Sequence, residues 1–544
     1  MTQTGIKTLR DSAAMRWTAL LLLALAMFCS YVFMDILSPI KDLMQDTRGW
    51  DSASFGRMQG AEVFLNVYVF FLIFAGIILD KMGVRFTAVL SGAVMLFGGL
   101  IKFYAVSDAF IGTSLEAWFT NNLNWNGELP VIGAILPFAA GMPASAKLAA
   151  LGFMFFGCGC EMAGITVSRG IVKWFKGRET ALAMGSEMAL ARLGVATCMI
   201  FSPYFAKLGG EIHVDNAVKF GVVLLCIALI MFITYFFMDK KLDSQTGEAE
   251  EKDDPFKISD LGKIFTSLGF WLVALLCVLY YSAIFPFQKY AVNMLQCNLV
   301  LTPADPNTFW GGEMVTWVQY GLMLVVAAGS FSSNFIKNNK GLKYGLMAVA
   351  VVALIVYCYM GYMRGTAETI FAVFPLLAVA ITPILGNYVD HKGKAASMLM
   401  LGSILLVVCH LTFAFILPGV SAASPAGGVV VAYATILVLG ASFSLVPAAL
   451  WPSVPKLVDE KIIGSAYAAI FWIQNIGLGL FPALIGMVLN NTNPEGTAAH
   501  DLNYTWALVM LAALGIAALL ISVYLKAVDK KKGYGLEQPN IKAE

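Results

Sequence analysis

The stretch Gly76–Arg85 reads GIILDKMGVR and holds the pattern that decides the fold. It ends one apolar run, at about 58–79, and precedes another, at about 86–106. Each run has about twenty residues, which is long enough for a helix to cross a bilayer. Two such runs joined by a short charged turn predict a helical hairpin that crosses a membrane twice.

Similar apolar runs continue along the whole chain of 544 residues, of which 59% are hydrophobic and 13% are charged. The runs are too long for the strands of a β-barrel and lack their alternation. Inside a bilayer only helices then pair every backbone amide. We therefore predict an all-α membrane protein with fourteen spans. They lie at about 17–39, 58–79, 86–106, 148–171, 180–204, 218–238, 266–290, 314–333, 345–363, 369–388, 395–417, 430–451, 463–489 and 504–525.

Basic residues are distributed unevenly among the predicted loops. Lys7, Arg10 and Arg16 precede the first span, and the basic turns at 81–85 and 173–178 follow even-numbered spans. By the positive-inside rule both termini are cytoplasmic. The net charge of +2 lies in narrow bands between spans, so the expected partner is the lipid bilayer and no nucleic acid. We expect an integral multi-pass protein of a bacterial inner (plasma) membrane.

An internal repeat indicates two related halves. Gly386–Lys394 reads GNYVDHKGK and ends the tenth predicted span. Like Gly76–Arg85, it has the form GxxxDxxG with a basic residue beside it, at a cytoplasmic helix end. Two copies at matching positions are typical of transporters built from repeats. The charged, turn-rich segment 239–262 has the composition of a solvated linker between the halves.

The repeated turns are candidate gating elements. A glycine such as Gly76 lets two helices approach closely. Asp80 suits the N-terminus of a neighbouring helix, and Arg85 suits an acidic partner. We predict contacts that form when the cytoplasmic side closes and break when it opens. The candidate gating residues are Gly76, Asp80, Gly83, Arg85, Gly386, Asp390 and Gly393.

The two turns resemble the loop signatures of the major facilitator superfamily. Five more strings resemble a dipeptide-transporting branch of that family: WFKGRE at 174–179, MALARLG at 188–194, YYSAIFPF at 280–287, GSAY at 464–467 and IQNIG at 473–477. The resemblance implies the major facilitator fold, with two six-helix bundles related by pseudo-two-fold symmetry. It also implies a carrier that works by alternating access. The sequence holds no sign of an accessory subunit.

The resemblance also divides the chain into parts. The N-terminal six-helix bundle is expected at 1–238, the cytoplasmic linker at 239–262 and the C-terminal six-helix bundle at 263–526. A cytoplasmic tail is expected at 527–544. The resemblance fails inside the C-terminal half, where we predict an inserted helical hairpin at about 298–368.

Two charged residues have equal depth in consecutive predicted spans. Glu161 lies about 12 residues before the turn at 173–178 and Arg192 about 14 after it, or roughly 18 and 21 Å above it. A charge at such depth costs on the order of 2.5–3.5 kcal/mol and needs a partner or water. One interpretation is an ion pair that fixes helix packing. The other is a zwitterion clamp, in which Glu161 faces an ammonium group and Arg192 binds a carboxylate bidentately.

Other polar side chains complete the candidate substrate site. Gln474 and Asn475 are amides that need partners in hydrocarbon. Tyr31, Tyr280 and Tyr281 reach similar depth, although core packing explains each of them equally well. The resemblance assigns the acidic and arginine positions of the clamp to the ends of a bound peptide.

Four further polar residues lie in the spans. Asp35 and Glu62 are nearer the outer surface, where they are candidates for vestibule charges or proton sites. Glu187 is about a turn and a half from Arg192 and can pair with it locally. His410 lies mid-span, and a packing role explains this position better than a role in a proton relay.

The sequence thus predicts a secondary transporter of small zwitterionic solutes, dipeptides or short peptides, with protons as the candidate coupling ion. The alternative is a proton-coupled carrier of organic anions, monocarboxylates or amino acids, and a sensor or scaffold on a transporter fold is the alternative from another class. We expect no enzyme, because the chain has no HExxH motif, no P-loop and four histidines. Eight of the nine cysteines fall in apolar runs, where thiols behave as small hydrophobic groups, so a disulfide framework is not expected. No catalytic residue, metal site or cofactor is expected either.

Overall fold

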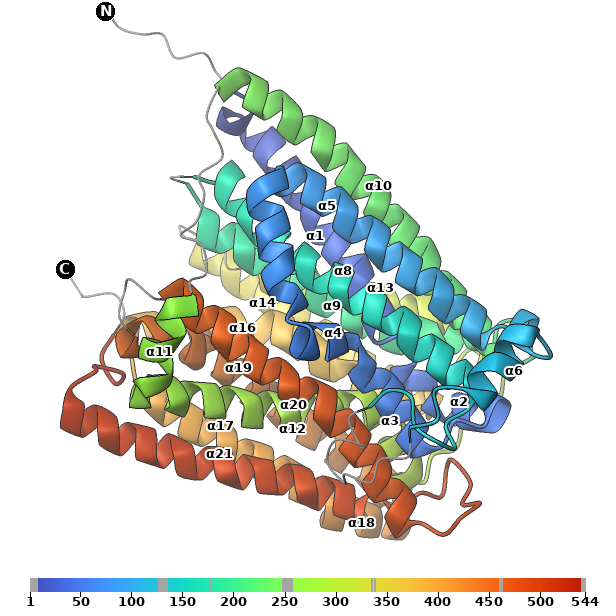
Figure 1. Cartoon of the computed structure of the whole chain (residues 1–544). Helices are drawn as coiled ribbons and strands as arrows, with labels where there is room; N and C mark the ends of the chain where they lie inside the picture. Colours follow the sequence, from blue (N-terminus) through green and yellow to red (C-terminus); the bar gives the residue numbers. More distant parts are fainter. Residues whose placement is uncertain are drawn as a thin grey trace, which may run out of the picture.

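The computed structural model describes residues 8–125, 136–176, 178–246, 258–333, 336, 339–458 and 463–539. Regular structure in these residues is helical, apart from one isolated bridge between Trp125 and Ala139. Thirteen of the described helices are long and apolar enough to cross a membrane. Figure 1 shows these helices packed side by side. The chain is therefore an all-helical, multi-pass membrane protein, as predicted.

Long helices alternate with short connecting ones. The long helices are α1 (Ala13–Met34), α5 (Phe71–Val106), α8 (Ala144–Trp174), α9 (Thr180–Ala206), α10 (Val214–Thr246), α12 (Leu268–Asn298), α13 (Glu313–Ser333), α14 (Lys340–Arg364), α16 (Val373–Lys392), α17 (Ala395–Leu411), α19 (Pro425–Leu457), α20 (Ile463–Thr492) and α21 (Thr505–Lys532). The short ones are α2 (Lys41–Arg48), α3 (Ser52–Gly60), α4 (Phe64–Tyr68), α6 (Ser114–Asn121), α11 (Ile258–Thr266), α15 (Ala367–Phe371) and α18 (Leu417–Ala423).

Thirteen candidate spans are counted where fourteen were expected, because parts of the spans predicted at 58–79 and 86–106 are joined in α5 and counted together. The first is broken into α3, α4 and the first arm of α5, with Phe70 at a φ of 56° before α5. Gly83 inside α5 has φ 81° and ψ 166°, which breaks the helix there. Glycine reaches such angles at little cost. Figure 1 shows α5 as two arms that meet at a sharp turn, and together they count as one span.

The helices pack in two groups. One contains α1, α5, α8, α9 and α10, and the other contains α12, α16, α17, α19, α20 and α21. The groups meet where α3 packs on α20 and α9 packs on α16. This arrangement matches the expectation of two bundles, although the boundaries at 1–238 and 263–526 stay a prediction.

Small residues bring α5 and α8 together. A Cβ atom at Gly98 would lie 2.4 Å from the backbone oxygen of Gly152, and one at Gly159 would lie 2.6 Å from the Cγ atom of Met95. Glycine at these positions permits the close backbone approach that holds membrane helices together where no hydrophobic force acts between them.

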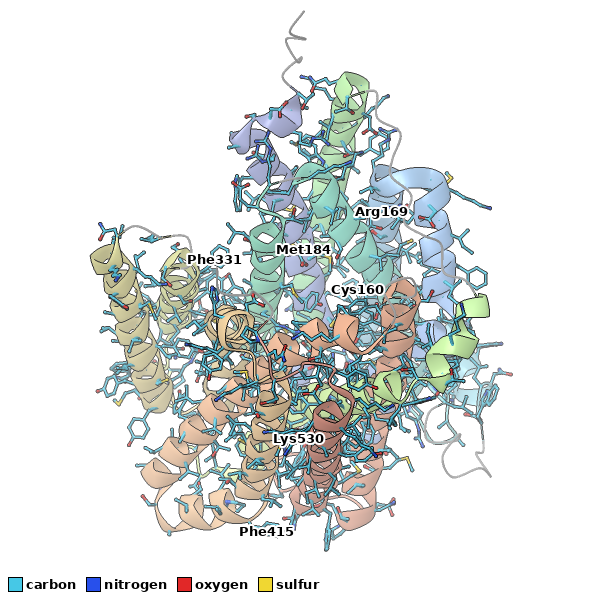
Figure 2. All side chains as sticks on the ribbon, turned by 90° about the vertical axis from the view of Figure 1, so that its left-hand side faces the viewer. Cys160, Arg169, Met184, Phe331, Phe415 and Lys530 are labelled. Atoms are coloured by element: carbon cyan, nitrogen blue, oxygen red, sulfur yellow. The ribbon has the colours of Figure 1, made fainter. Side chains whose placement is uncertain are left out.

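The hairpin predicted at about 298–368 is formed by α13 and α14, and Figure 2 shows it at one side of the molecule, near the labelled Phe331. It does not pack on the C-terminal half alone. The ring of Trp317 lies 5.0 Å from that of Phe201 in α9. On the other side, the Tyr357 hydroxyl donates to the carbonyl of Thr369, at 3.0 Å. Helix α13 also packs on α16, so the hairpin contacts helices of both groups.

The linker expected at 239–262 begins later than its composition suggests. Residues 239–246 continue α10, and residues 247–257 lie outside the described part of the chain. Asp239 is fully buried and accepts hydrogen bonds from Lys173 at 2.7 Å and from the Trp174 indole at 3.0 Å. The two aspartates at the start of the segment, Asp239 and Asp243, are therefore paired within the helices, whereas Lys240 and Lys241 are exposed.

The tail expected at 527–544 is also partly ordered on the protein. Helix α21 continues to Lys532, and Leu536 beyond it is fully buried. The backbone carbonyls of Leu536 and Glu537 accept from the amides of Ala395 and Lys394, at 3.0 and 3.1 Å. These contacts cap the start of α17 and satisfy amides that a helix N-terminus leaves unpaired.

Candidate functional site

A cavity of about 950 Å³ lies among α1, α5, α8, α9, α10 and α20. On α8 its lining residues are Glu161, Gly164, Ile165, Ser168, Arg169, Val172 and Lys173. On α9 they are Met184, Glu187, Met188, Ala191 and Arg192. Intervals of three and four residues place each set on one face of its helix. The cavity reaches from Glu161 and Arg192 to the basic ends of the helices at the turn 173–178.

Glu161 lies at the inner end of the cavity and contacts the second group of helices. Its Oε1 atom accepts a hydrogen bond from Asn475 Nδ2 of α20, at 3.2 Å. Asn475 is 4% exposed, so this amide finds the partner that its position in the membrane demands. Glu161 thereby ties α8 to α20 across the junction of the two groups.

Arg192 is surrounded by aromatic rings from both groups. Its guanidinium carbon lies 5.9 Å from the ring centre of Tyr31 in α1, 5.0 Å from Phe285 in α12 and 5.1 Å from Phe443 in α19. Such cation–π contacts stabilise a guanidinium group and leave its edge free for hydrogen bonds.

No ion pair within 4 Å joins Glu161 to Arg192, although both are described and both line the cavity. The interpretation of a packing ion pair is therefore not supported by this conformation. Glu187 also lines the cavity, and it makes no ion pair with Arg192. The expected local pairing of these two residues is therefore not a direct ion pair in this conformation.

Of the three tyrosines predicted for the site, one lines the cavity and two are buried elsewhere. Tyr31 lines the cavity. Tyr280 and Tyr281 are buried in the second group, where the Tyr280 hydroxyl bonds to the Ser442 carbonyl at 2.7 Å and the Tyr281 hydroxyl accepts from Trp451 at 3.1 Å. Both tyrosines thus follow the core-packing interpretation.

Gln474, the neighbour of Asn475, is 8% exposed, and its Oε1 atom accepts from the Cys277 thiol at 3.2 Å. It packs α20 on α12 and is not among the residues that line the cavity. Of the two adjacent amides, only Asn475 touches a charged residue of the candidate site.

Two cavity residues of α20 were not predicted as site residues. Tyr467 and Phe471 line the cavity opposite α8 and α9. Tyr467 ends the GSAY string that supported the family resemblance, and Phe471 follows it by one helical turn. The spacing of four residues was the signal that could have identified this face.

The first gating turn makes its contacts within the first group of helices. Asp80 pairs with Arg169 of α8 at 2.6 Å, and Arg85 pairs with Asp243 of α10 at 2.8 Å. The acidic partner expected for Arg85 is therefore present, but Asp80 meets an arginine in place of a helix N-terminus. No atom lies within 4 Å of a Cβ placed on Gly76, so the expected close helix approach is absent in this conformation.

The second gating turn lies under the C-terminal segment. Gly393 has a φ of 73°, and a Cβ there would lie 2.4 Å from the carbonyl carbon of Gln538. Gly386, like Gly76, has open space beside it. Asp390 is half-buried at the end of α16. The two copies of the turn thus have different surroundings in this conformation.

An exposed ion pair holds the start of the chain at the end of the molecule that the sequence predicts to be cytoplasmic. Asp11 pairs with Arg178 in the turn between α8 and α9, at 2.8 Å. The backbone amide and the hydroxyl of Thr8 donate to Asp11, which together with Arg178 lowers the pKa of this carboxyl group. Asp11 therefore stays ionised and favours this position of the N-terminal segment.

The side of the molecule away from the cavity, which is the outer side in the predicted orientation, is sealed by contacts between the two groups. Lys289 of α12 lies 2.8 Å from Asp35 and 3.7 Å from Glu62. Gln288 donates to Asp35 at 2.6 Å, and the Tyr290 hydroxyl donates to the Ser52 carbonyl at 2.9 Å. Asp35 and Glu62 are thus part of a seal and do not line an open vestibule. Lys289, which completes it, was not predicted as a functional residue.

The contact between Asp80 and Arg169 gives a first prediction. Asp80→Asn removes a charge from a pair that is present while the cavity reaches the helix ends at the turn 173–178, which are cytoplasmic in the predicted orientation. Partly exposed pairs contribute about 0.2–1 kcal/mol, so this conformation should lose up to about fivefold in population. A cysteine at Ser168, which is exposed in the cavity, should then react more slowly with a thiol reagent. Lys81→Gln in the same turn is the control, and equal labelling rates in both variants would contradict the prediction.

The chain resembles known transport proteins. The model of the Major Facilitator Superfamily matches residues 129–366. The chain is 25% identical to the lysosomal dipeptide transporter MFSD1 of Bos taurus over 421 residues, which cover 76% of this chain and 72% of that protein. It is 24% identical to the Homo sapiens protein of the same name, over 74% of this chain and 70% of that protein.

Solved structures show the same fold. The nucleoside transporter NupG superposes with a TM-score of 0.59, at 11% identity, over 93% of this chain and 99% of that one. A bacterial homologue of the human peptide transporters PepT1 and PepT2 gives 0.57, at 12% identity, over 95% and 99%. The chain is thus similar to transporters of the major facilitator superfamily. Among the proteins of that superfamily, it is distantly related in sequence to the lysosomal dipeptide transporter MFSD1.

Proposed function

We propose that this transporter carries dipeptides or other short zwitterionic peptides, with Glu161 facing the substrate ammonium and Arg192 binding its carboxylate. The observation that carries the proposal is the presence of both side chains in one cavity without an ion pair between them. Each is held by neutral partners, Asn475 for Glu161 and aromatic rings for Arg192. Both charges are therefore left for the two ends of a substrate.

The position of the pair favours alternating access. Glu161 contacts α20 and Arg192 contacts α12 and α19, so both sit where the two groups of helices meet. A substrate bound at such a junction is exposed to one side or the other as the groups rock. The homology to a dipeptide transporter supports peptides as the substrate class. The expected orientation, with both termini in the cytoplasm of a bacterium, is part of the proposal.

Thermal stabilisation of the purified protein tests the substrate class. A ligand at a hundredfold excess over its Kd stabilises the folded state by about 2.7 kcal/mol, which raises the melting temperature. We expect Ala-Ala to do so, and expect N-acetyl-Ala-Ala and Ala-Ala-amide, which each lack one terminal charge, to have little effect. Stabilisation by lactate or acetate alone would favour the organic-anion carrier, and stabilisation by alanine alone would favour an amino-acid carrier.

Uptake into liposomes tests transport itself. Labelled Ala-Ala should enter vesicles that contain the protein, and a sensor or scaffold would bind the peptide without moving it. Repeating the assay with an inward proton gradient distinguishes a facilitator from a proton symporter. The initial rate of a facilitator depends on the peptide gradient alone. A proton symporter accumulates the peptide inside the vesicles above its equilibrium concentration.

A further inference from the structure

A lysine buried beside the seal is held by aromatic rings. Lys102 lies in the second arm of α5 and is 0% exposed, and among the described residues its ammonium group has no hydrogen-bond partner. The nitrogen lies 3.6 Å from the ring centre of Phe153 in α8 and 5.3 Å from that of Phe33 in α1. Aromatic rings attract a cation, but they do not replace the hydration that a buried charge loses. Ionisable groups inside the membrane are costly and usually functional, so Lys102 is a candidate for a role in the transport cycle.

Lys102 belongs to a cluster of four charged residues. The ammonium group of Lys289 lies 5.8 Å from the ring centre of Phe153, so the two lysines lie near the same ring. Lys102 is also within electrostatic range of Asp35 and Glu62, the two carboxylates with which Lys289 forms the seal. Two cations and two anions therefore balance while the seal is closed. We call these four residues the seal cluster.

The seal cluster draws its residues from both groups of helices. Lys289 comes from α12, in the second group. Lys102 lies in α5 and Asp35 ends α1, both in the first group. Glu62 lies in the short helix η3 (Ala61–Val63), which packs mainly on α8 of the first group. Separation of the groups at the seal would thus remove Lys289 and leave two carboxylates with Lys102.

Lys102 and Glu62 pack against the same helix. A Cβ atom at Gly152 of α8 would lie 2.7 Å from the backbone nitrogen of Lys102, and one at Gly157 would collide with the backbone oxygen of Glu62. These two glycines are five residues apart, or about 7.5 Å along the helix. A lysine carries its ammonium group on a flexible four-carbon stem, which can cover much of that distance.

Glu62 is the more loosely held of the two carboxylates. Its Oε2 atom lies 3.7 Å from the ammonium group of Lys289, whereas Asp35 lies 2.8 Å from it. Asp35 also accepts a hydrogen bond from Gln288 at 2.6 Å. Glu62 is therefore the carboxylate that can turn to another cation more easily.

We infer that Lys102 is an exchange partner, which pairs with Glu62 when the seal opens and Lys289 moves away. The exchange keeps a cation beside the two carboxylates in both conformations. Closing of the seal returns Lys289 to the cluster and releases Lys102 to the aromatic rings. The inference rests on the alternating access of the proposed function, but it is independent of which solute is carried.

Replacing Lys102 with methionine tests the exchange. The substitution keeps an unbranched side chain and removes the charge, so opening would leave both carboxylates without a cation. A cysteine at Ser52 reports opening, because Ser52 is 2% exposed and its carbonyl accepts from Tyr290 across the seal. In Lys102→Met this cysteine should react at least about tenfold more slowly with an impermeant thiol reagent, since an unpaired buried charge is strongly unfavourable. A cysteine at Ser168, in the cavity, should react as fast as before or faster.

Two further variants make the test specific. Adding Glu62→Gln to Lys102→Met removes one carboxylate together with one cation, which restores the wild-type net charge of the cluster in both conformations. Labelling of Ser52→Cys and uptake of Ala-Ala should therefore recover toward wild type. Lys207→Met changes an exposed lysine just after α9 and is the matched control, which should label like the wild-type protein.

Four results would contradict the inference. Unchanged labelling of Ser52→Cys in Lys102→Met, with normal uptake, would overturn the exchange and leave the proposed function standing. Slow labelling that persists after addition of Glu62→Gln would show that the effect does not depend on that carboxylate. Faster labelling at both Ser52→Cys and Ser168→Cys would show that Lys102 only supports packing. Absence of Ala-Ala uptake by the wild-type protein would overturn the proposed function, and the exchange with it.

Discussion

Replacing Arg192 with lysine is expected to abolish most transport, although the substitution keeps the positive charge. The guanidinium group lies against the rings of Phe285 and Phe443, 5.0 and 5.1 Å from their centres. This leaves the planar edge of the group for a carboxylate, to which it can make two parallel hydrogen bonds. Lysine offers a compact charge on a flexible stem and cannot reproduce that geometry.

The size of the effect follows from the bonds lost. Loss of one charged hydrogen bond corresponds to about 1.5–3 kcal/mol, or a fall of about 10- to 100-fold in kcat/KM for peptide uptake. Stabilisation by Ala-Ala in the melting assay should fall in parallel. Because the charge and most of the volume are retained, the melting temperature of the empty protein should change little.

A lysine at another arginine position is the matched control. Arg178 is partly exposed at the cytoplasmic turn, where it pairs with Asp11. Arg178→Lys should keep wild-type uptake, because an exposed pair contributes little and a lysine preserves it. Wild-type uptake by Arg192→Lys would contradict the clamp, and would leave the family and the fold untouched.

Counting residues was sufficient to predict the depth of the charged pair. Glu161 and Arg192 flank one short turn on consecutive antiparallel helices, so the fixed rise of a helix determines their height. Their contacts could not be predicted in the same way. Asn475 is 314 residues from Glu161 along the chain, and it reaches the carboxylate only because α8 and α20 come together. That contact depends on packing between the two groups, which local periodicity does not record.

Two charged residues were misjudged from the sequence because tertiary packing buries them. The start of the segment 239–262 is charged, and charge alone indicates a solvated linker. In the folded chain, however, Asp239 is paired with Lys173, so the helix continues. Lys289 was not recognised as a functional residue for the same reason. It lies at the end of the span predicted at 266–290, where a lysine is expected to reach the membrane surface. Tertiary packing buries it instead, with its side chain 9% exposed.

Replacing Lys289 with methionine is expected to open the outer seal or destabilise the protein. Lys289 pairs with Asp35 at 2.8 Å and lies 3.7 Å from Glu62, and the Asp35 side chain is 1% exposed. Methionine fills a similar volume but leaves two carboxylates without their cation. Removal of one partner from a buried pair costs about 3–5 kcal/mol. The protein can avoid this cost by admitting water, that is, by separating α12 from α1 on the outer side.

Labelling of the seal distinguishes opening from general loss of structure. Ser52 is 2% exposed and its carbonyl accepts from Tyr290 of α12, so a cysteine at this position should be protected in the closed seal. In Lys289→Met it should react at least tenfold faster with an impermeant thiol reagent added from outside. Reactivity that rises equally at Ser168, in the cytoplasmic cavity, would indicate unfolding in place of opening.

A second substitution tests whether charge is the cause. Adding Asp35→Asn to Lys289→Met removes one of the uncompensated carboxylates and should restore part of the protection, because mutations within one charged network are not additive. Lys289→Arg keeps the cation and should remain close to wild type. Uptake should fall in Lys289→Met and recover partly in the double variant, since a carrier that cannot close its outer side cannot complete the transport cycle. Full protection of Ser52→Cys in Lys289→Met would contradict this prediction. It would show that uncharged contacts, such as that of Tyr290 with Ser52, hold the seal closed. The buried lysine would then serve only to neutralise its two neighbours.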